Sequence, residues 1–328
     1  MAKRRKKKWK PKSPKEAISF LISLFVVFLC SISFIVTYQE KYGTLPSWDD
    51  LMGHFGLSHE TVMEIPKEVL QTGTSVHFID VGQADATLIL SNGKSCLIDA
   101  GDLDSADALL GYLDAVGLET LDYLVMSHPH ADHIGSMDDV LENYKVEQVI
   151  LPEFSLAPAP TSKIFQKVIG LIGEKQIPAI TAQPGQTYSL GNGTLEVLTA
   201  GIKTDNYNNL SPIIKFSEGF SVLFTGDAEK EVEQDALKKG VNLKADVFQS
   251  GHHGSSTSNT LDFMQAVRPQ LTVISCGQDN SYGHPHKEAI KNIQSVSSSI
   301  YRTDEQGTVV IYQQDNELKV WTEKQKAA

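Results

Sequence analysis

Cysteine is scarce in this chain, with only three among its 328 residues. Cys30 lies in a long uncharged run, while Cys96 and Cys276 lie in strand-like runs, where a thiol is typical of a small buried side chain. Three isolated cysteines exclude a disulfide framework as the source of stability. With 41% apolar and 21% charged residues, the chain has the composition of a globular protein built on an ordinary hydrophobic core.

Positive charge is scarce outside the first few residues. Residues 1–16 carry a formal charge of +8, and because the whole chain carries −11, the remainder carries −19. Affinity for the DNA backbone depends on Lys and Arg side chains that neutralise phosphates. The acidic body therefore argues against strong nonspecific DNA binding, although a local basic patch is still compatible with this composition.

Charged residues are absent from 18–38. Twenty-one residues at ~1.5 Å each span roughly 30 Å, the thickness of a bilayer core. Basic residues flank only the N-terminal side, so the positive-inside rule predicts a cytoplasmic tail at 1–17, a single-pass transmembrane anchor at 18–38 and a catalytic domain outside the cell. The tail would also contact anionic lipids. A cleaved signal peptide is the alternative, but its apolar region is usually shorter and ends in an A-x-A-like site, which is absent here.

The rest of the chain is expected to form a stalk at 39–73 and one domain at 74–322. Three strand-like runs with an Asn92-Gly93 turn open the domain. Further strands are expected at 121–127, 146–152, 212–217, 220–225, 244–249, 270–275, 299–302 and 308–313, with a strand at 318–322 closing the sheet and a hairpin over 188–198 whose tip is 191–193. Helices are expected at 105–117, 138–144, 161–176, 229–238, 260–267 and 286–295. Strand-rich and helix-interleaved stretches thus occur twice. This layout predicts an α/β fold with two mixed sheets packed face to face and helices outside, an αββα sandwich.

Three imidazoles and a carboxylate occur within six residues, directly after an apolar strand-like run. Imidazole and carboxylate groups are the usual ligands of zinc and related divalent cations. On a helix His128 and His130 would point about 200° apart, but in a loop both can face one metal ion while Asp132 and His133 turn towards a second. The cluster therefore predicts a dinuclear metal site; the alternative, a surface loop that is histidine-rich by chance, conflicts with the strong clustering.

Two further strand ends offer ligands. Asp227 follows an apolar strand-like run and could bridge two cations, or else cap the next helix. His252 and His253 follow another such run, and both are candidate metal ligands. Because adjacent residues at a strand end point to opposite sides, one is expected to bind metal while the other supports it or contacts substrate. The sequence does not decide which.

Polar loops near these positions suit an anionic substrate. The backbone N–H groups of Gly254, Ser255 and Ser256 form a candidate anion-binding segment. His284 lies in a Tyr-Gly-His-Pro loop and could donate a proton to a leaving group or hold a phosphate. The alternative for His284 is an ordinary surface histidine.

The order HxHxDH, then GD, then HH, each after a strand, resembles the metallo-β-lactamase superfamily. The similarity is more specific to the C-terminal hydrolase domain of ComEC-type competence proteins, and rests on residues 78–86, 97–101, 252–258 and 282–286. It covers roughly 74–313. The resemblance implies two divalent cations, zinc or alternatively manganese, and hydrolysis of a phosphodiester.

The chain departs from this pattern in three ways. ComEC-type proteins carry a multi-helix channel region, whereas this chain has one expected span, which puts DNA import by this chain in doubt. Ala84 stands where the family motif has glycine, so the turn there must tolerate a Cβ. No histidine occurs between His133 and His252, and 208–211 (Asn-Asn-Leu-Ser) fills that interval as in ComEC-like domains. One metal site is therefore expected to lack a protein ligand, with water or Asn completing it.

The resulting hypothesis is a hydrolase with two metal ions bridged by Asp227. Asp132 would orient the nucleophile as well as bind metal, and His284 would act on the substrate. Residues expected to support the ligands from behind are Asp80, Asp99, Asn209 and Ser211. The candidate substrates are a nucleic acid, a nucleotide or a phosphorylated polymer. The alternatives are a hydrolase of another ester or a lactam, and a non-catalytic metal-binding receptor or scaffold; the sequence leaves the oligomeric state open.

Overall fold

The computed structural model describes residues 65–296 and 298–324, together with 28, 31–32, 34–37 and 39. The chain divides into two units, Met1–Val62 and Met63–Ala328, and the fold below is that of the second. The expected tail at 1–17, most of the expected anchor at 18–38 and the stalk up to residue 64 lie outside the described residues. Within the described part of the chain, we find no helix with the length and apolar character needed to span a bilayer.

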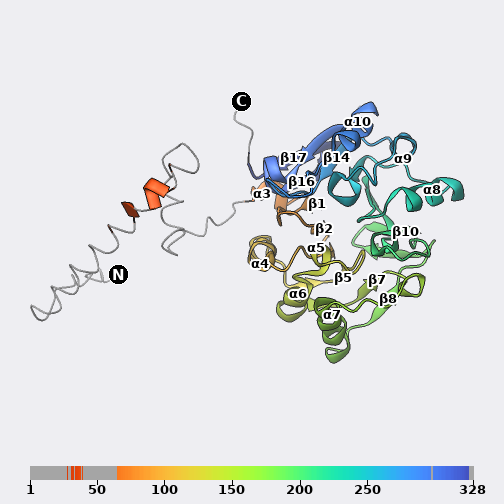
Figure 1. The fold of residues 1–328 in the computed structure, drawn as a ribbon, viewed down its shortest axis with the longest axis horizontal. Helices are drawn as coiled ribbons and strands as arrows, with labels where there is room; N and C mark the ends of the chain where they lie inside the picture. The colour runs from red at the N-terminus through yellow and green to blue at the C-terminus, as the bar shows by residue number, and fades with distance from the viewer. Residues whose placement is uncertain are drawn as a thin grey trace, which may run out of the picture. The chain divides into compact units, whose positions relative to one another are not determined.

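The first sheet has eight strands in the order β17-β16-β1-β2-β3-β5-β7-β8 (Figure 1). Its strands are β1 (Thr74–Phe78), β2 (Thr87–Ser91), β3 (Lys94–Ile98), β5 (Tyr123–Val125), β7 (Val149–Leu151), β8 (Ala179–Thr181), β16 (Val309–Gln314) and β17 (Glu317–Thr322). Pairing is antiparallel from β17 to β3 and parallel from β3 to β8. The expected strand at 318–322 is therefore the edge strand of this sheet.

The second sheet has seven strands in the order β15-β14-β13-β12-β11-β10-β9. They are β9 (Thr187–Leu190), β10 (Gly193–Thr199), β11 (Ile213–Glu218), β12 (Phe220–Phe224), β13 (Val247–Gln249), β14 (Leu271–Ile274) and β15 (Ser299–Arg302). β9 to β12 pair antiparallel, and β12 to β15 pair parallel. Two short strands, β4 (Thr120–Leu121) and β6 (Lys145–Val146), form a separate pair.

The inner faces of the two sheets pack against each other. Along β1 the side chains alternate, so Val76 and Phe78 enter the core between the sheets, where Phe78 meets Phe224 of β12 with ring centroids 6.4 Å apart. His77, between them, points to the other face and bonds Tyr112. Alternate side chains along the strand therefore point either into the core between the two sheets or into the core between the sheet and its outer helices, as expected for a sandwich.

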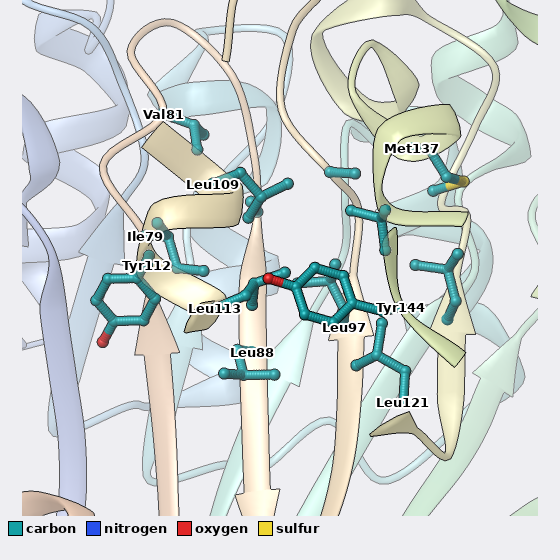
Figure 2. Close-up of a cluster of buried hydrophobic side chains, with 14 of the residues drawn as sticks. Ile79, Val81, Leu88, Leu97, Leu109, Tyr112, Leu113, Leu121, Met137 and Tyr144 are labelled. Carbon is teal, nitrogen blue, oxygen red and sulfur yellow. The ribbon is translucent and has the colours of Figure 1, made fainter. Parts of the chain in front are cut away.

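Helices cover both outer faces. The helices on the first sheet are α4 (Ala106–Ala115), α6 (Met137–Asn143) and α7 (Lys163–Glu174), and those on the second are α8 (Lys230–Lys239), α9 (Leu261–Val267) and α10 (Lys287–Ser295). Figure 2 shows Leu109, Tyr112 and Leu113 of α4 meeting Leu88 and Leu97 of the sheet. The predicted αββα sandwich with two mixed sheets is confirmed.

The domain begins before the expected boundary at residue 74. Ile65 and Val69, the latter in α3 (Lys67–Leu70), are buried in the core between the first sheet and its helices. The remaining short elements are α5 (Ala131–Ile134), α11 (Thr303–Gln306) and the 3-10 turns η1 (Phe154–Leu156), η2 (Tyr207–Leu210) and η3 (Gly251–Gly254). Of these, α5, η2 and η3 contribute to the site described next.

Candidate metal centre

Three loops that leave the C-terminal ends of strands converge at one edge of the sandwich. The first follows β5 of the first sheet and runs through His128 into α5. The second follows β12 of the second sheet and carries Asp227, and the third follows β13 and forms η3. Parallel strands end at the same edge of a sheet, so β12 and β13 bring their loops together, and face-to-face packing adds the loop from the first sheet.

The carboxylate of Asp227 lies between two groups of histidines. Its Oδ2 is 3.7 Å from His128 Nε2 and 3.5 Å from His252 Nε2. His130 Nδ1 in turn lies 3.0 Å from His128 Nε2. We call His128, His130, His252 and Asp227 Oδ2 the outer ligand set, because His130 and His252 are partly exposed.

The other carboxylate oxygen faces a more deeply buried group. Asp227 Oδ1 is 3.1 Å from His133 Nε2 and 3.8 Å from His253 Nε2, and the latter atom is 3.4 Å from Asp132 Oδ2. We call Asp132, His133, His253 and Asp227 Oδ1 the deep ligand set. Ligand atoms of His133, Asp227, His253 and Asp85 all lie within 4.8 Å of one another, a spacing that suits a metal ion.

Atoms of the deep ligand set lack the hydrogen bonds that buried polar atoms normally make. His133 Nε2, His253 Nε2 and Asp227 Oδ1 are fully buried and have no hydrogen-bond partner, although they face one another. Leaving three such atoms unpaired would cost about 1–3 kcal/mol each. Their donor types match those of zinc and related cations. These residues therefore fit a divalent cation, as the sequence predicts.

The structure sends the two adjacent histidines of η3 to different ligand sets. Both adopt the left-handed region, with φ of 52° at His252 and 54° at His253, a conformation that non-glycine residues seldom adopt. Their rings are 6.1 Å apart and inclined at 66°. His252 Nε2 faces Asp227 Oδ2 and His253 Nε2 faces Asp227 Oδ1, so both rings lie at the centre, and the expectation that only one of them binds metal stays a prediction.

Asn259 holds η3 in this conformation, a role that sequence reasoning missed. Its side chain is fully buried; Oδ1 accepts from the Gly251 N–H at 3.0 Å, and Nδ2 donates to the carbonyls of Gly251 at 2.9 Å and Ser255 at 3.2 Å. Glu233 of α8 in turn accepts from the Asn259 N–H. Backbone strain persists where the surroundings fix it, and this buried amide supplies that restraint.

Two of the four residues expected to support the ligands do contact them. Asp99 Oδ2 accepts from His133 Nδ1 at 2.7 Å, and its other oxygen accepts from the Ser127 N–H. Ser211 Oγ lies 3.4 Å from His128 Nδ1 and accepts from the Asp227 N–H. Such contacts fix the tautomer of a ligating imidazole, which leaves Nε2 of each ring for the metal.

The other two expected supports lie elsewhere. Asp80 accepts from the Gly82 N–H and pairs with Lys324 at 3.2 Å, so it holds a turn and not an imidazole. Asp85, five residues on, lies nearer the centre: it is buried, accepts from Gln249 Nε2 at 2.8 Å and lies 3.9 Å from His253 Nδ1, which is itself hydrogen-bonded to the Ser275 carbonyl at 3.0 Å. Both aspartates belong to the sequence Asp-Val-Gly-Gln-Ala-Asp at 80–85, called the DVGQAD motif below. Only the fold shows that Asp85 is the one that turns inward.

Asn209 does not complete a metal site. Its Oδ1 accepts from the Glu229 N–H at 2.9 Å, and the neighbouring Asn208 donates to the Glu229 carboxylate. His252, whose Nε2 lies 3.5 Å from Asp227 Oδ2, is instead the candidate for the ligand that was expected to be missing. Tyr207, in the same turn η2, places its ring 5.8 Å from that of His130.

Burial and charge act in opposite directions on the titratable ligands. Burial lowers the pKa of His128 well below its usual value. Burial also lowers the pKa of His133, but the carboxylates of Asp227 and Asp99 outweigh it and raise this pKa well above its usual value. Burial raises the pKa of Asp227, yet His133 and His253 more than offset this, so the carboxylate is ionised. Cation binding would therefore displace protons from His133.

The candidate anion-binding segment has fewer free donors than expected. The Ser255 N–H donates to the His252 carbonyl at 2.8 Å, and the Ser256 N–H donates to His286 Nδ1 at 2.9 Å. These bonds count against Ser255 and Ser256 as anion ligands through the backbone. Anion binding by Gly254 stays a prediction.

His284 lies beside the centre. Its ring is 5.6 Å from that of His252 and 6.2 Å from that of His253, and it stacks on Tyr282 at 5.6 Å. Burial and the neighbouring histidines lower the pKa of His284 to about 4, so the imidazole is neutral near pH 7. The alternative of an isolated surface histidine is therefore wrong.

Comparison with known proteins agrees with this geometry. A family model described as the metallo-β-lactamase superfamily matches residues 79–278. ComE operon protein 3 of Bacillus subtilis is 29% identical over 260 residues, covering 73% of this chain and 33% of the relative. Recombination protein 2 of Haemophilus influenzae is 31% identical over 250 residues, covering 74% and 29%. The chain thus spans about a third of the length of these distant relatives.

Among solved structures, CmlA, a diiron β-hydroxylase from Streptomyces venezuelae, is similar with a TM-score of 0.51. The alignment covers 81% of this chain and 59% of that protein at 15% sequence identity. At this identity the likeness concerns the fold alone.

Proposed function

The chain belongs to the metallo-β-lactamase superfamily, and from this premise we propose that it is a dinuclear-metal hydrolase that cleaves phosphodiesters. The observation that carries the proposal is the position of Asp227. One buried carboxylate presents Oδ1 to the deep ligand set and Oδ2 to the outer ligand set. A bridging carboxylate between two such groups is the arrangement that two-metal hydrolases use.

Each ligand set supplies enough donors for one cation. His128, His130 and His252 with Asp227 would hold the first, and Asp132, His133 and His253 with Asp227 the second. Histidine-rich sets favour zinc, and manganese is the alternative because carboxylates also contribute. When bound, the cations would acidify water and offset the negative charge that develops on the phosphoryl group.

Side chains at the mouth of the site would act on water and substrate. The Asp132 side chain is 33% exposed, whereas the Asp227 side chain is only 2% exposed, so Asp132 can orient a water molecule that enters from solvent. His284 lies next to His252 and His253, where it can contact a phosphoryl oxygen.

Nucleic acid is the substrate class that the relatives favour. One of them is named as a recombination protein, and recombination acts on DNA. The part of the chain after residue 16 is acidic, and affinity for the nucleic-acid backbone depends on Lys and Arg side chains. This favours single-stranded DNA or a short nucleic acid that is held at the metal centre itself. A nucleotide or a phosphorylated polymer that contains a phosphodiester bond is an alternative substrate.

The test is metal content and turnover of the full-length protein. We expect about two equivalents of zinc or manganese, and hydrolysis of bis-p-nitrophenyl phosphate and single-stranded DNA. His252→Gln should lose the outer equivalent and retain the deep one, while His253→Gln should do the reverse. Each variant, like His130→Ala, should lower kcat at least 100-fold, as expected for removal of a group that stabilises transition-state charge.

His286→Gln is the matched control, because His286 lies in the same region but in neither ligand set. It should keep both equivalents. Full metal content without turnover of any diester would redirect the proposal to another ester or lactam, or to a binding role. Absence of metal would overturn it.

We also propose that residues 18–38 anchor the protein in the cell membrane, with the tail at 1–17 in the cytoplasm and the hydrolase domain outside. The support is the uncharged run and its one-sided basic flank. Protease added to intact cells should remove the domain and leave an N-terminal epitope protected. A protected domain would contradict this topology.

A further inference from the structure

Gln83 connects the two sheets next to the metal centre. It lies in the loop between β1 and β2 of the first sheet, and its side chain reaches the loop that follows β14 of the second. There Oε1 lies 2.9 Å from the Gly277 backbone nitrogen, and Nε2 lies 3.3 Å from His284 Nδ1. Gln83 belongs to the DVGQAD motif, and neither ligand set uses it.

The orientation of the Gln83 amide follows from its partners. A backbone N–H can only donate, so the amide atom facing Gly277 must be the carbonyl oxygen. The other amide atom is then the NH₂ group, which can only donate. His284 Nδ1 must therefore accept, and its proton must lie on Nε2.

The approach of these groups is closely constrained. A Cβ on Gly277 would come within 2.7 Å of the Gln83 backbone nitrogen, so a larger residue there would push the two loops apart. Asn280 fixes His284 from the other side: its Oδ1 accepts from the His284 N–H at 2.9 Å, and its Nδ2 donates to the His284 carbonyl at 2.7 Å. Both ring and backbone of His284 are thus held.

We propose that Gln83 is a positioning residue that fixes His284 as a neutral imidazole with its proton on Nε2, so that His284 holds a phosphoryl oxygen by a hydrogen bond. Within the described residues Nε2 makes no hydrogen bond, which leaves its N–H for the substrate. A neutral imidazole is a hydrogen-bond donor but a poor proton donor. His284 therefore binds charge on the substrate and does not protonate the leaving group.

This inference rests on the proposed function for its consequence in catalysis, but the tautomer can be measured without any substrate. In the full-length, zinc-loaded, ¹⁵N-labelled protein, nitrogen NMR should show His284 with an unprotonated Nδ1 and a protonated Nε2. The His284 signals are assigned by their loss in His284→Gln. A proton on Nδ1 in the unaltered protein would overturn the inference.

Gln83→Glu is the decisive variant. A carboxylate keeps the side-chain length and an acceptor for the Gly277 N–H, but it reverses the polarity at His284 Nδ1. The tautomer of His284 in this variant is measured at about pH 9, where a histidine beside a carboxylate is neutral. The imidazole proton of His284 should then lie on Nδ1. Metal content should stay unchanged, and kcat/KM on bis-p-nitrophenyl phosphate should fall about 100-fold. An unchanged tautomer in this variant would contradict the proposal.

Variants at His284 show whether His284 acts as a hydrogen-bond donor to the substrate or as a proton donor to the leaving group. His284→Gln retains an N–H near the position of Nε2 and should keep much more activity than His284→Leu. Gln83→Glu combined with His284→Leu should be no slower than His284→Leu alone, because both act through one group. Equal loss in the Gln and Leu variants, or additive losses in the double variant, would overturn the assignment. If no diester is cleaved, the proposed function fails, while the NMR result still decides the role of Gln83.

Discussion

Asp99 illustrates how one buried side chain organises the centre at the residue scale. Its carboxylate accepts hydrogen bonds from the Nδ1–H of His133 at 2.7 Å and from both the backbone N–H and the hydroxyl of Ser127. Ser127 Oγ in turn lies 3.0 Å from Nδ1 of His128. A single carboxylate therefore orients one ring of each ligand set.

Replacing Asp99 by Asn should weaken metal binding without removing a ligand. The amide is less basic and cannot accept every bond that the carboxylate accepts, so His133 loses its fixed tautomer. We expect about 10–100-fold weaker binding of zinc, measured by competition with a chromogenic chelator. Asp80→Asn is the matched control, because Asp80 bonds Gly82 and Lys324 away from the centre. Equal affinities of the two variants would contradict this role.

At the scale of elements, tight backbone contacts position the ligand-bearing loops. The DVGQAD turn needs a positive φ only at Gly82, at 77°, and the buried Ala84 packs its methyl group into the core, which explains why alanine is tolerated where the family motif has glycine. Gly135 ends α5, and a Cβ there would lie 2.2 Å from backbone atoms of Asp102 and Leu103. The loop that carries Asp132 and His133 is thus packed against the chain after β3.

Gly135→Ala should therefore be destabilising although Gly135 touches no ligand atom. The clash is with backbone, which cannot move aside like a flexible side chain, and overpacking of this kind costs about 1–3 kcal/mol. Urea unfolding should show that loss together with reduced metal content. Gly170→Ala in the exposed part of α7 meets nothing within 4 Å and should instead stabilise the protein by about 0.5–1 kcal/mol. Equal effects of the two changes would contradict this packing argument.

At the scale of the whole molecule, the metal centre joins the two sheets. His128, His130, Asp132 and His133 follow β5 of the first sheet, whereas Asp227, His252 and His253 follow β12 and β13 of the second. Bound cations would therefore add a cross-link between the two sheets, beside their shared apolar core and the hydrogen bonds of Gln83 and Gln249. Binding to the folded state alone must raise its stability.

Removal of metal should lower the thermal stability of the protein. At a free metal concentration 100 times its Kd, binding contributes about 2.7 kcal/mol per site. Differential scanning calorimetry of metal-loaded and chelator-treated protein should show a lower Tm in the treated sample. Asp227→Asn, which alters the carboxylate shared by both ligand sets, should abolish most of this difference. An identical Tm with and without metal would show that the centre does not link the sheets.

The sequence by itself determined the sandwich and indicated the residues that form most of the candidate metal centre. Period-two strands, helical spacing and turn residues act over a few neighbours, so the longer elements were predicted with boundaries shifted by only a few residues, whereas short ones such as β8 and α5 were not predicted. The group at 128–133 and the carboxylate after β12 were recognisable because metal chemistry restricts both residue type and spacing.

Only the tertiary structure decided which groups meet across the two sheets. The left-handed backbone at His252 and His253 depends on Asn259 and Glu233, and the choice of Asp85 over Asp80 depends on Gln249, which is 164 positions away in the chain. Gln83 and His284 are 201 positions apart. Such contacts arise when separate loops pack at one edge of the fold, and no local pattern encodes them.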